Sequence, residues 1–126
     1  MSNTSEAPAW HEDHRVVITP THYEIDIVGG WDEPATDVER ELEKTPDNLP
    51  PDRVCIKRNF TAGDQLQLDD YPDATNEKSR HQTMAFACIL SGVPMRHMKR
   101  MNFSDYAIVL DAVSEALAGK GPGAEG

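Results

Sequence analysis

The clearest pattern in the chain is an alternation of apolar and polar residues over residues 22–28. Tyr23, Ile25 and Ile27 fall on one side of an extended chain and polar residues on the other, which is typical of a strand with one buried face. Residues 53–58 repeat the alternation with Val54 and Ile56. We predict that the two stretches pair as a small antiparallel β-hairpin, which needs helices against it because two strands alone are marginally stable.

Beyond this hairpin, the apolar residues take the spacing of helices. The predicted helices cover about residues 77–91, 94–101 and 105–118. Gly92 is placed to end the first helix and Pro94 to begin the second. Ser104 is placed to cap the third helix, with Asp105 in its first turn, where the helix dipole favours a carboxylate. The predicted fold class is α+β, mostly α: the small β-hairpin followed by a compact C-terminal helical unit.

The remaining segments indicate one small domain with flexible ends. We expect residues 1–14 to be a flexible N-terminal arm, 15–118 to be a single domain and 119–126 to be a flexible C-terminal tail. Residues 29–52 join the two predicted strands and hold eight acidic and two basic residues. We call this segment the acidic connection, and within it Thr36 is placed to cap a short surface helix.

Charge and composition narrow the function classes. The chain of 126 residues has a formal net charge of -10, whereas most duplex-binding domains carry a basic surplus. No apolar run approaches the ~20 residues that cross a bilayer, and the first residues lack the pattern of a signal peptide. Cys55 and Cys88 are expected to be free thiols in a reducing cytoplasm, and a disulfide between them is the less favoured alternative.

The sequence gives no positive sign of catalysis. It contains no nucleophile elbow, phosphate loop, HExxH metal motif or Gly-rich dinucleotide turn, so we expect no enzymatic activity and no cofactor. His11 and His14 flank two acidic residues, but no third ligand is fixed nearby. We interpret them as part of the solvated arm and expect no metal site.

Three methionines recur at a spacing of three, Met95, Met98 and Met101. As core residues they would fill gaps in a small helical unit, and as surface residues they would form an adaptable docking surface. Periodic apolar residues usually face inward, which favours the core interpretation. Both interpretations remain open from the sequence alone.

The same segment holds a basic cluster, Arg96, Lys99 and Arg100, which is a quarter of the 12 basic residues. The cluster either balances charge within the molecule or docks an acidic partner. A DNA-reading helix ranks third, because this short segment offers Met rather than polar side chains for base edges. The candidate partner-binding residues are Val93, Met95, Arg96, Met98, Lys99, Arg100, Met101 and Tyr106.

Two segments carry a resemblance to a known family. Residues 54–66 read VCIKRNFTAGDQL, and residues 84–117 read MAFACILSGVPMRHMKRMNFSDYAIVLDAVSEAL. Together these segments resemble tail assembly chaperones of long-tailed bacteriophages. The resemblance lies in the basic pair Lys57-Arg58 followed by the turn at 61–64, in the break at 91–94, and in the helix start at Asp105-Tyr106. The resemblance covers residues 53–118, about half the chain, and the acidic connection is longer than the family's simple hairpin.

The resemblance implies a non-enzymatic protein of the host bacterial cytoplasm. Such chaperones bind the tape-measure protein, keep it soluble and help to recruit the tail-tube protein. Their genes often also give a longer frameshifted form, and Gly119-Lys120-Gly121 could be encoded by a slippery run. The first alternative is a structural tail or head–tail component retained in the virion, and the second is a small helix-turn-helix DNA-binding regulator. The preferred interpretation involves neither nucleic acid nor membrane.

Overall fold

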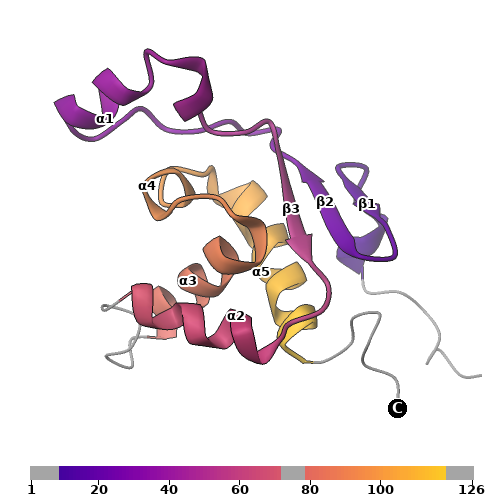
Figure 1. Cartoon of the computed structure of the whole chain (residues 1–126). Coiled ribbons are helices and arrows are strands. Elements are labelled where there is room, and N and C mark those ends of the chain that lie inside the picture. Colours follow the sequence, from indigo (N-terminus) through magenta and orange to yellow (C-terminus); the bar gives the residue numbers. More distant parts are fainter. Residues whose placement is uncertain (1–8, 72–78, 119–126) are drawn as a thin grey trace, which may run out of the picture.

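The computed structural model describes residues 9–71 and 79–118, in which helices pack on one face of a three-stranded antiparallel sheet (Figure 1). The strands are β1 (Val16–Ile18), β2 (His22–Asp26) and β3 (Arg53–Lys57). The α-helices are α1 (Asp37–Leu42), α2 (Ala62–Leu66), α3 (Ser79–Ser91), α4 (Met95–Met98) and α5 (Phe103–Leu117), and short 3-10 turns are η1 (Ala9–Glu12), η2 (Pro46–Asn48) and η3 (Gln67–Asp70). The predicted fold class, α+β and mostly α, is confirmed.

The predicted pairing of the two alternating stretches is also confirmed. Strands β2 and β3 are antiparallel, with Tyr23 opposite Ile56 and Ile25 opposite Val54. All four side chains are fully buried, because the alternation places them together on the face that α3 and α5 cover. The register therefore follows from burying one apolar face.

The edge strand β1 was not predicted. It pairs with β2 on the side opposite β3 and is joined to it by a tight turn in which the Thr19 N–H donates to the His22 carbonyl at 2.9 Å. Three consecutive apolar residues form β1, so it lacks the alternation that marks a half-buried strand. Val17 and Ile18 are accordingly exposed on this edge.

The helical half has the predicted order but different ends. Gly92 follows α3 with φ +78°, and its N–H donates to the Cys88 carbonyl at 2.8 Å, as predicted for a C-terminal glycine. Helix α4 is shorter than predicted: Pro94 precedes it and the helix ends at Met98. Ser104 is not the cap of α5, because Asn102 fills that position and its Oδ1 accepts from the Ser104 N–H at 2.9 Å.

Residues 9–14 are folded, which corrects the prediction of a flexible arm for this part. Trp10 packs against the core with its ring edge-on to Tyr23, at 5.1 Å between ring centroids. His11 Nε2 lies 2.9 Å from the Glu115 carboxylate, and the His11 side chain is only 13% exposed. Trp10, an aromatic residue in a polar segment, thus attaches residues 9–14 to the core. Residues 1–8 and the predicted tail 119–126 lie outside the described residues.

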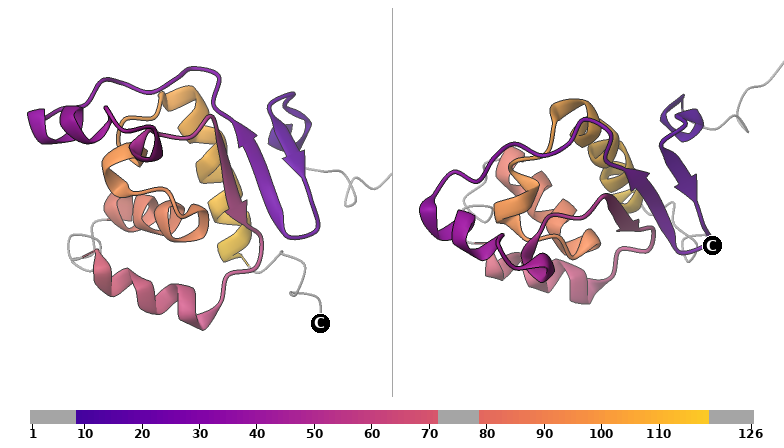
Figure 2. Two further views of the ribbon diagram at one scale, coloured as in Figure 1. Left: turned by 45° about the horizontal axis from the view of Figure 1, so that its top comes forward. Right: turned by 90° about the horizontal axis from the view of Figure 1, so that it is seen from above.

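The acidic connection crosses from β2 to β3 and places α1 beyond α4, away from the sheet (Figures 1 and 2). Thr36 caps α1 as predicted, with its Oγ1 accepting from the Glu39 N–H at 3.1 Å. Helix α1 buries none of its residues, and Val38 and Leu42 are 71% and 40% exposed. The helix is thus held by the connection rather than by a packed face.

Candidate functional site

An apolar groove lies where α3, α4 and α5 meet, with a volume of about 590 Å³. It is lined by Thr83, Met84, Met98, Lys99, Met101, Phe103, Tyr106 and Leu110. The lining combines unbranched methionine side chains, two aromatic rings and one cation, Lys99. A groove of this kind accepts an apolar face of a partner, because methionine adapts its shape and the aromatic rings give large contact areas.

Phe103 and Tyr106 form the exposed aromatic side of the groove. Phe103 is 74% exposed, and its ring centroid lies 6.4 Å from that of Tyr106. Tyr106 is half-buried, and burial raises the pKa of its phenol to about 12, so the ring is neutral at physiological pH. A phenylalanine this exposed at the first position of α5 stabilises the fold little and is available to a partner.

Of the three methionines of the stripe, Met98 and Met101 line the groove and Met95 does not. Met98 and Met101 are 1% and 8% exposed and belong to the hydrophobic core. Met95 is half-buried, packs against the core and lies with its sulfur 4.0 Å from the Cys88 sulfur. The core interpretation of the methionine stripe therefore describes the structure, and an exposed methionine docking surface does not. Val93, also a candidate, is 7% exposed and part of the same core.

The three basic residues of the cluster have different surroundings. Lys99 is exposed at the edge of the groove. Arg100 is half-buried, and both Nη atoms of its guanidinium contact the carboxylate of Glu43 from the acidic connection, Nη2 at 3.1 Å. Arg96 is half-buried, and its buried Nε makes no hydrogen bond within the described part of the chain. Arg100 thus fits the interpretation that charge is balanced within the molecule, whereas Lys99 faces solvent.

His97 lies beside the Arg100–Glu43 pair without contributing a stable charge to it. Its Nδ1 is 3.8 Å from Glu43 and 3.4 Å from Arg100 Nη1. Burial lowers the pKa of His97, and the neighbouring Arg96 lowers it further. The hydrogen bond from Arg100 holds the pKa of Glu43 below its usual range, so the carboxylate stays charged near neutrality. The charge pair at this position is therefore Glu43 with Arg100.

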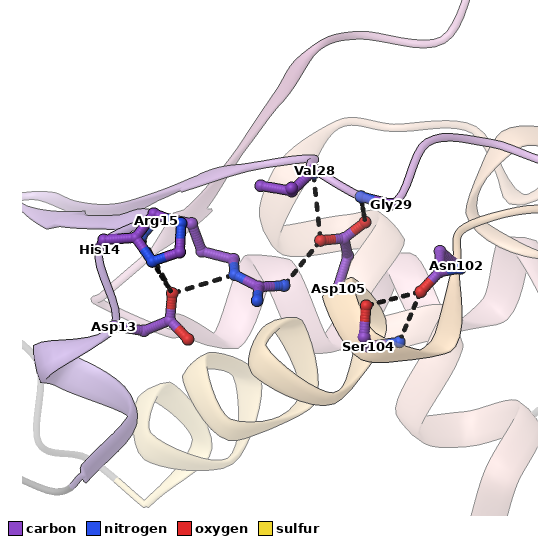
Figure 3. Close-up of polar contacts among 8 residues, drawn as sticks. All are labelled: Asp13, His14, Arg15, Val28, Gly29, Asn102, Ser104 and Asp105. Carbon is purple, nitrogen blue, oxygen red and sulfur yellow. Dashed lines mark hydrogen bonds and ion pairs between the residues drawn. The ribbon is translucent and has the colours of Figure 1, made fainter.

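The sequence did not reveal the contacts that position α5 and, with it, the α5 side of the groove. Asp105 is completely buried and accepts from Arg15 Nη1 at 2.9 Å and from the Val28 and Gly29 N–H groups at 3.2 and 2.8 Å (Figure 3). Arg15 is itself oriented by Asp13, whose Oδ1 accepts from its Nε at 2.9 Å. The helix-dipole position of Asp105 was visible in the sequence, but its partners come from segments far away.

Gly29 has a steric reason to be glycine at this junction. A Cβ atom there would lie 2.5 Å from Cγ of Asn102, the cap of α5. The glycine lets the end of β2 approach the first turn of α5 closely enough for Asp105 to reach the backbone N–H groups. Asn102, Asp105 and the Val28–Gly29 backbone therefore fix where the groove's aromatic side begins.

The other candidate groups of the sequence lie apart from the groove. Cys55 and Cys88 are free thiols, as predicted, and burial raises the pKa of Cys88 to about 12. His11 contacts Glu115, while the His14 side chain is 83% exposed. Residues 9–71 and 79–118 hold no group of three His, Cys, Asp or Glu side chains placed to bind a metal ion.

Comparisons of the chain with models of protein families, with curated proteins and with solved structures give no match. Within the described ranges no helix has the length and apolar character that crossing a membrane requires.

Proposed function

We propose that the protein is a non-enzymatic tail assembly chaperone that acts in the cytoplasm of an infected bacterium. It binds an apolar helical segment of the tape-measure protein in the groove between α3, α4 and α5, keeps that protein soluble and helps to recruit the tail-tube protein. The observation that carries the proposal is the groove itself, an apolar surface with a 74% exposed Phe103 on an otherwise highly charged protein.

The shape and chemistry of the groove favour a helix as its occupant. Helices dock in grooves through apolar residues three and four apart, and a groove of about 590 Å³ with Met84, Phe103 and Leu110 offers apolar contacts for such a stripe. A tape-measure protein that has not yet been enclosed by the tube exposes long helical segments, according to the resemblance. Covering these segments prevents their self-association.

The net charge of the chain supports the solubilising part of the proposal. With a formal net charge of -10, each bound copy would add negative charge to the covered segment. Like-charged complexes repel one another and remain in solution. The single exposed cation among the groove residues, Lys99, would attract an acidic residue on the segment while the chain as a whole stays net negative.

Co-expression with the tape-measure protein encoded in the same genome tests the proposal. We expect the full chain to keep the tape-measure protein in the soluble fraction and to co-purify with it. Phe103→Ser should abolish most of this effect, whereas Leu66→Ser should not. Leu66 is the matched control because it is 71% exposed and lies on α2, outside the groove. Equal loss in both variants, or no co-purification by the wild type, would contradict the proposal.

Mass spectrometry of purified virions separates the chaperone from a structural component. A chaperone is absent or far below stoichiometric amounts in the finished particle, whereas a component retained in the tail is present in fixed proportion. Detection of the chain at one copy per tail ring would favour the structural alternative. The same purification would show whether a longer frameshifted form accompanies the chain during assembly.

A further inference from the structure

The apolar groove continues into a second, more polar depression. This depression has a volume of about 380 Å³ and is lined by Gly29, Gly30, Trp31, Asp32, Lys99, Arg100, Met101 and Asn102. Lys99 and Met101 line both depressions. A segment that lies in the apolar groove and extends past Met101 therefore reaches the surroundings of Arg100.

Arg100 is held in the orientation that suits a carboxylate. Its Nε donates to the Asp32 carbonyl at 2.8 Å, and the Asp32 N–H donates to the Arg100 carbonyl at 2.7 Å. The first bond orients the guanidinium through its Nε and the second ties the two backbones together, so both Nη atoms are directed at a carboxylate in the two-point geometry typical of strong arginine pairs. In the free chain that carboxylate belongs to Glu43.

The segment that carries Glu43 is held by a few polar contacts and by little apolar packing. Helix α1 has six residues, none of them buried, and a helix this short is unstable by itself in water. Val38 and Leu42 remain 71% and 40% exposed, so little apolar packing would be lost if α1 moved away. The polar contacts between residues 32–48 and the α4 region are the bonds of Asp32, the Glu43–Arg100 pair with His97 Nδ1 3.8 Å from Glu43, and a hydrogen bond between His97 and the Asn48 backbone.

We propose that Glu43 is an intramolecular stand-in for a partner carboxylate, so that the acidic connection masks Arg100 until a client binds. The client is then an amphipathic helix that carries an Asp or Glu beside its apolar stripe. Its apolar side chains enter the groove, and its carboxylate displaces Glu43 from Arg100 with Lys99 nearby. The inference rests on the proposed function, because it names the chemistry of the segment that the groove binds.

The exchange of one carboxylate for another explains why the masking is reversible. Release of Glu43 breaks one charged pair and the client forms an equivalent one, so the net cost is small. The freed connection adds its acidic residues to the surface of the complex. An Arg100 guanidinium without any carboxylate would be far more costly, because its side chain is only 9% exposed, and this cost keeps the connection closed in the absence of a client.

Hydrogen exchange of the full chain, free and in complex with the tape-measure protein, tests the inference. We expect amides of residues 39–45 to exchange at least about fivefold faster in the complex, because a released α1 melts. Amides of α4 and of the first turn of α5 should exchange more slowly because the groove is covered. Without the tape-measure protein, the Glu43→Gln variant should already show fast exchange at residues 39–45. The Glu41→Gln variant should not, because Glu41 is an exposed residue of α1 that does not contact Arg100.

The affinity of the variants for a tape-measure peptide is a second test of the inference. The tape-measure peptide protected in the complex serves as the probe, and Glu43→Gln should bind it about three- to tenfold more tightly than wild type and Glu41→Gln do. Replacing the peptide's Asp or Glu by Asn or Gln should remove that difference. Protected groove amides with unchanged exchange at 39–45 and equal affinities would overturn the inference while leaving the proposed function intact. Unprotected groove amides in the complex would overturn both.

Discussion

Removal of the Asp105 carboxylate should destabilise the whole fold, because this one group joins three segments. It accepts three hydrogen bonds, from Arg15, Val28 and Gly29, and no part of it is exposed. A hydrogen bond to a charged group contributes about 1.5–3 kcal/mol, and breaking a buried ion pair on one side costs about 3–5 kcal/mol. We therefore expect Asp105→Ala to lower the free energy of unfolding by about 3–5 kcal/mol.

Urea unfolding followed by Trp fluorescence measures this loss, since Trp10 packs near the network and Trp31 lies at the far end of the Gly29–Gly30 turn. Asp111→Ala is the matched control, because Asp111 is an exposed carboxylate on the same helix α5 and should change stability by less than about 0.5 kcal/mol. Asp105→Asn keeps the size of the side chain but places donors opposite donors, so it should also be strongly destabilising.

The double variant tests whether Arg15 and Asp105 act together. Arg15→Met should cost less than Asp105→Ala, because the two backbone N–H groups still satisfy part of the carboxylate. The double variant should be more stable than the sum of the two single losses predicts, with a coupling of about 1–3 kcal/mol. A loss below about 1 kcal/mol for Asp105→Ala, or additive effects in the cycle, would refute the assigned role of this network.

Further predictions follow from the buried and charged groups. Met98→Ala should cost about 2–5 kcal/mol in urea unfolding, because Met98 is 1% exposed, and a near-neutral result would return it to the surface interpretation. The Cys88 thiol, with its pKa raised to about 12 by burial, should react with a thiol reagent at pH 8 only after unfolding. Because Arg100 lowers the pKa of Glu43 from its ordinary 4.5, their pair stabilises the closed connection above that pH, and the stabilisation is lost as the pH falls through the lowered pKa. Trp31 fluorescence should report this acid transition and Glu43→Gln should lack it. No shift of duplex DNA is expected at physiological salt, and a salt-dependent shift would support the DNA-binding alternative.

The sequence predicted those parts of the fold whose signal is local. Alternation at Tyr23 and Ile25 matched that at Val54 and Ile56, and burying both sets on one face left a single register. Gly92 marked the end of α3 because a left-handed residue at that position has a strong preference for glycine. These features depend on neighbouring residues, which is why they could be read from one sequence.

The features that the sequence did not predict depend on contacts between segments far apart in the chain. Asn102 and Ser104 are both residue types that cap helices well, so the sequence did not decide between them. In the structure Asn102 caps α5, and it lies against Gly29 from a distant segment. Trp10 lies in a polar segment, so its packing against Tyr23 had no local sign. The groove was found in part: Met98, Lys99, Met101 and Tyr106 were candidates, and the structure places them together with residues of α3 and α5.

Phe103 was not among the candidate residues, although it is the most exposed apolar residue of the groove. A hydrophobic residue just before a capped helix commonly packs back onto that helix, which is a structural role. In the structure it stays 74% exposed because α5 begins at Phe103 itself. Helix α5 begins at residue 103 rather than at the predicted 105, and Phe103 is therefore a candidate binding residue instead of a packing residue.

Site-specific photocrosslinking from position 103 tests the central claim, that the groove binds the tape-measure protein. A photoreactive phenylalanine analogue replaces Phe103, or Leu66 as the matched exposed position on α2, during co-expression with the tape-measure protein. We predict an abundant crosslink from position 103 to an apolar helical segment of the tape-measure protein and none from position 66. A complex that forms without a crosslink from 103, or with equal crosslinking from both positions, would contradict binding in the groove.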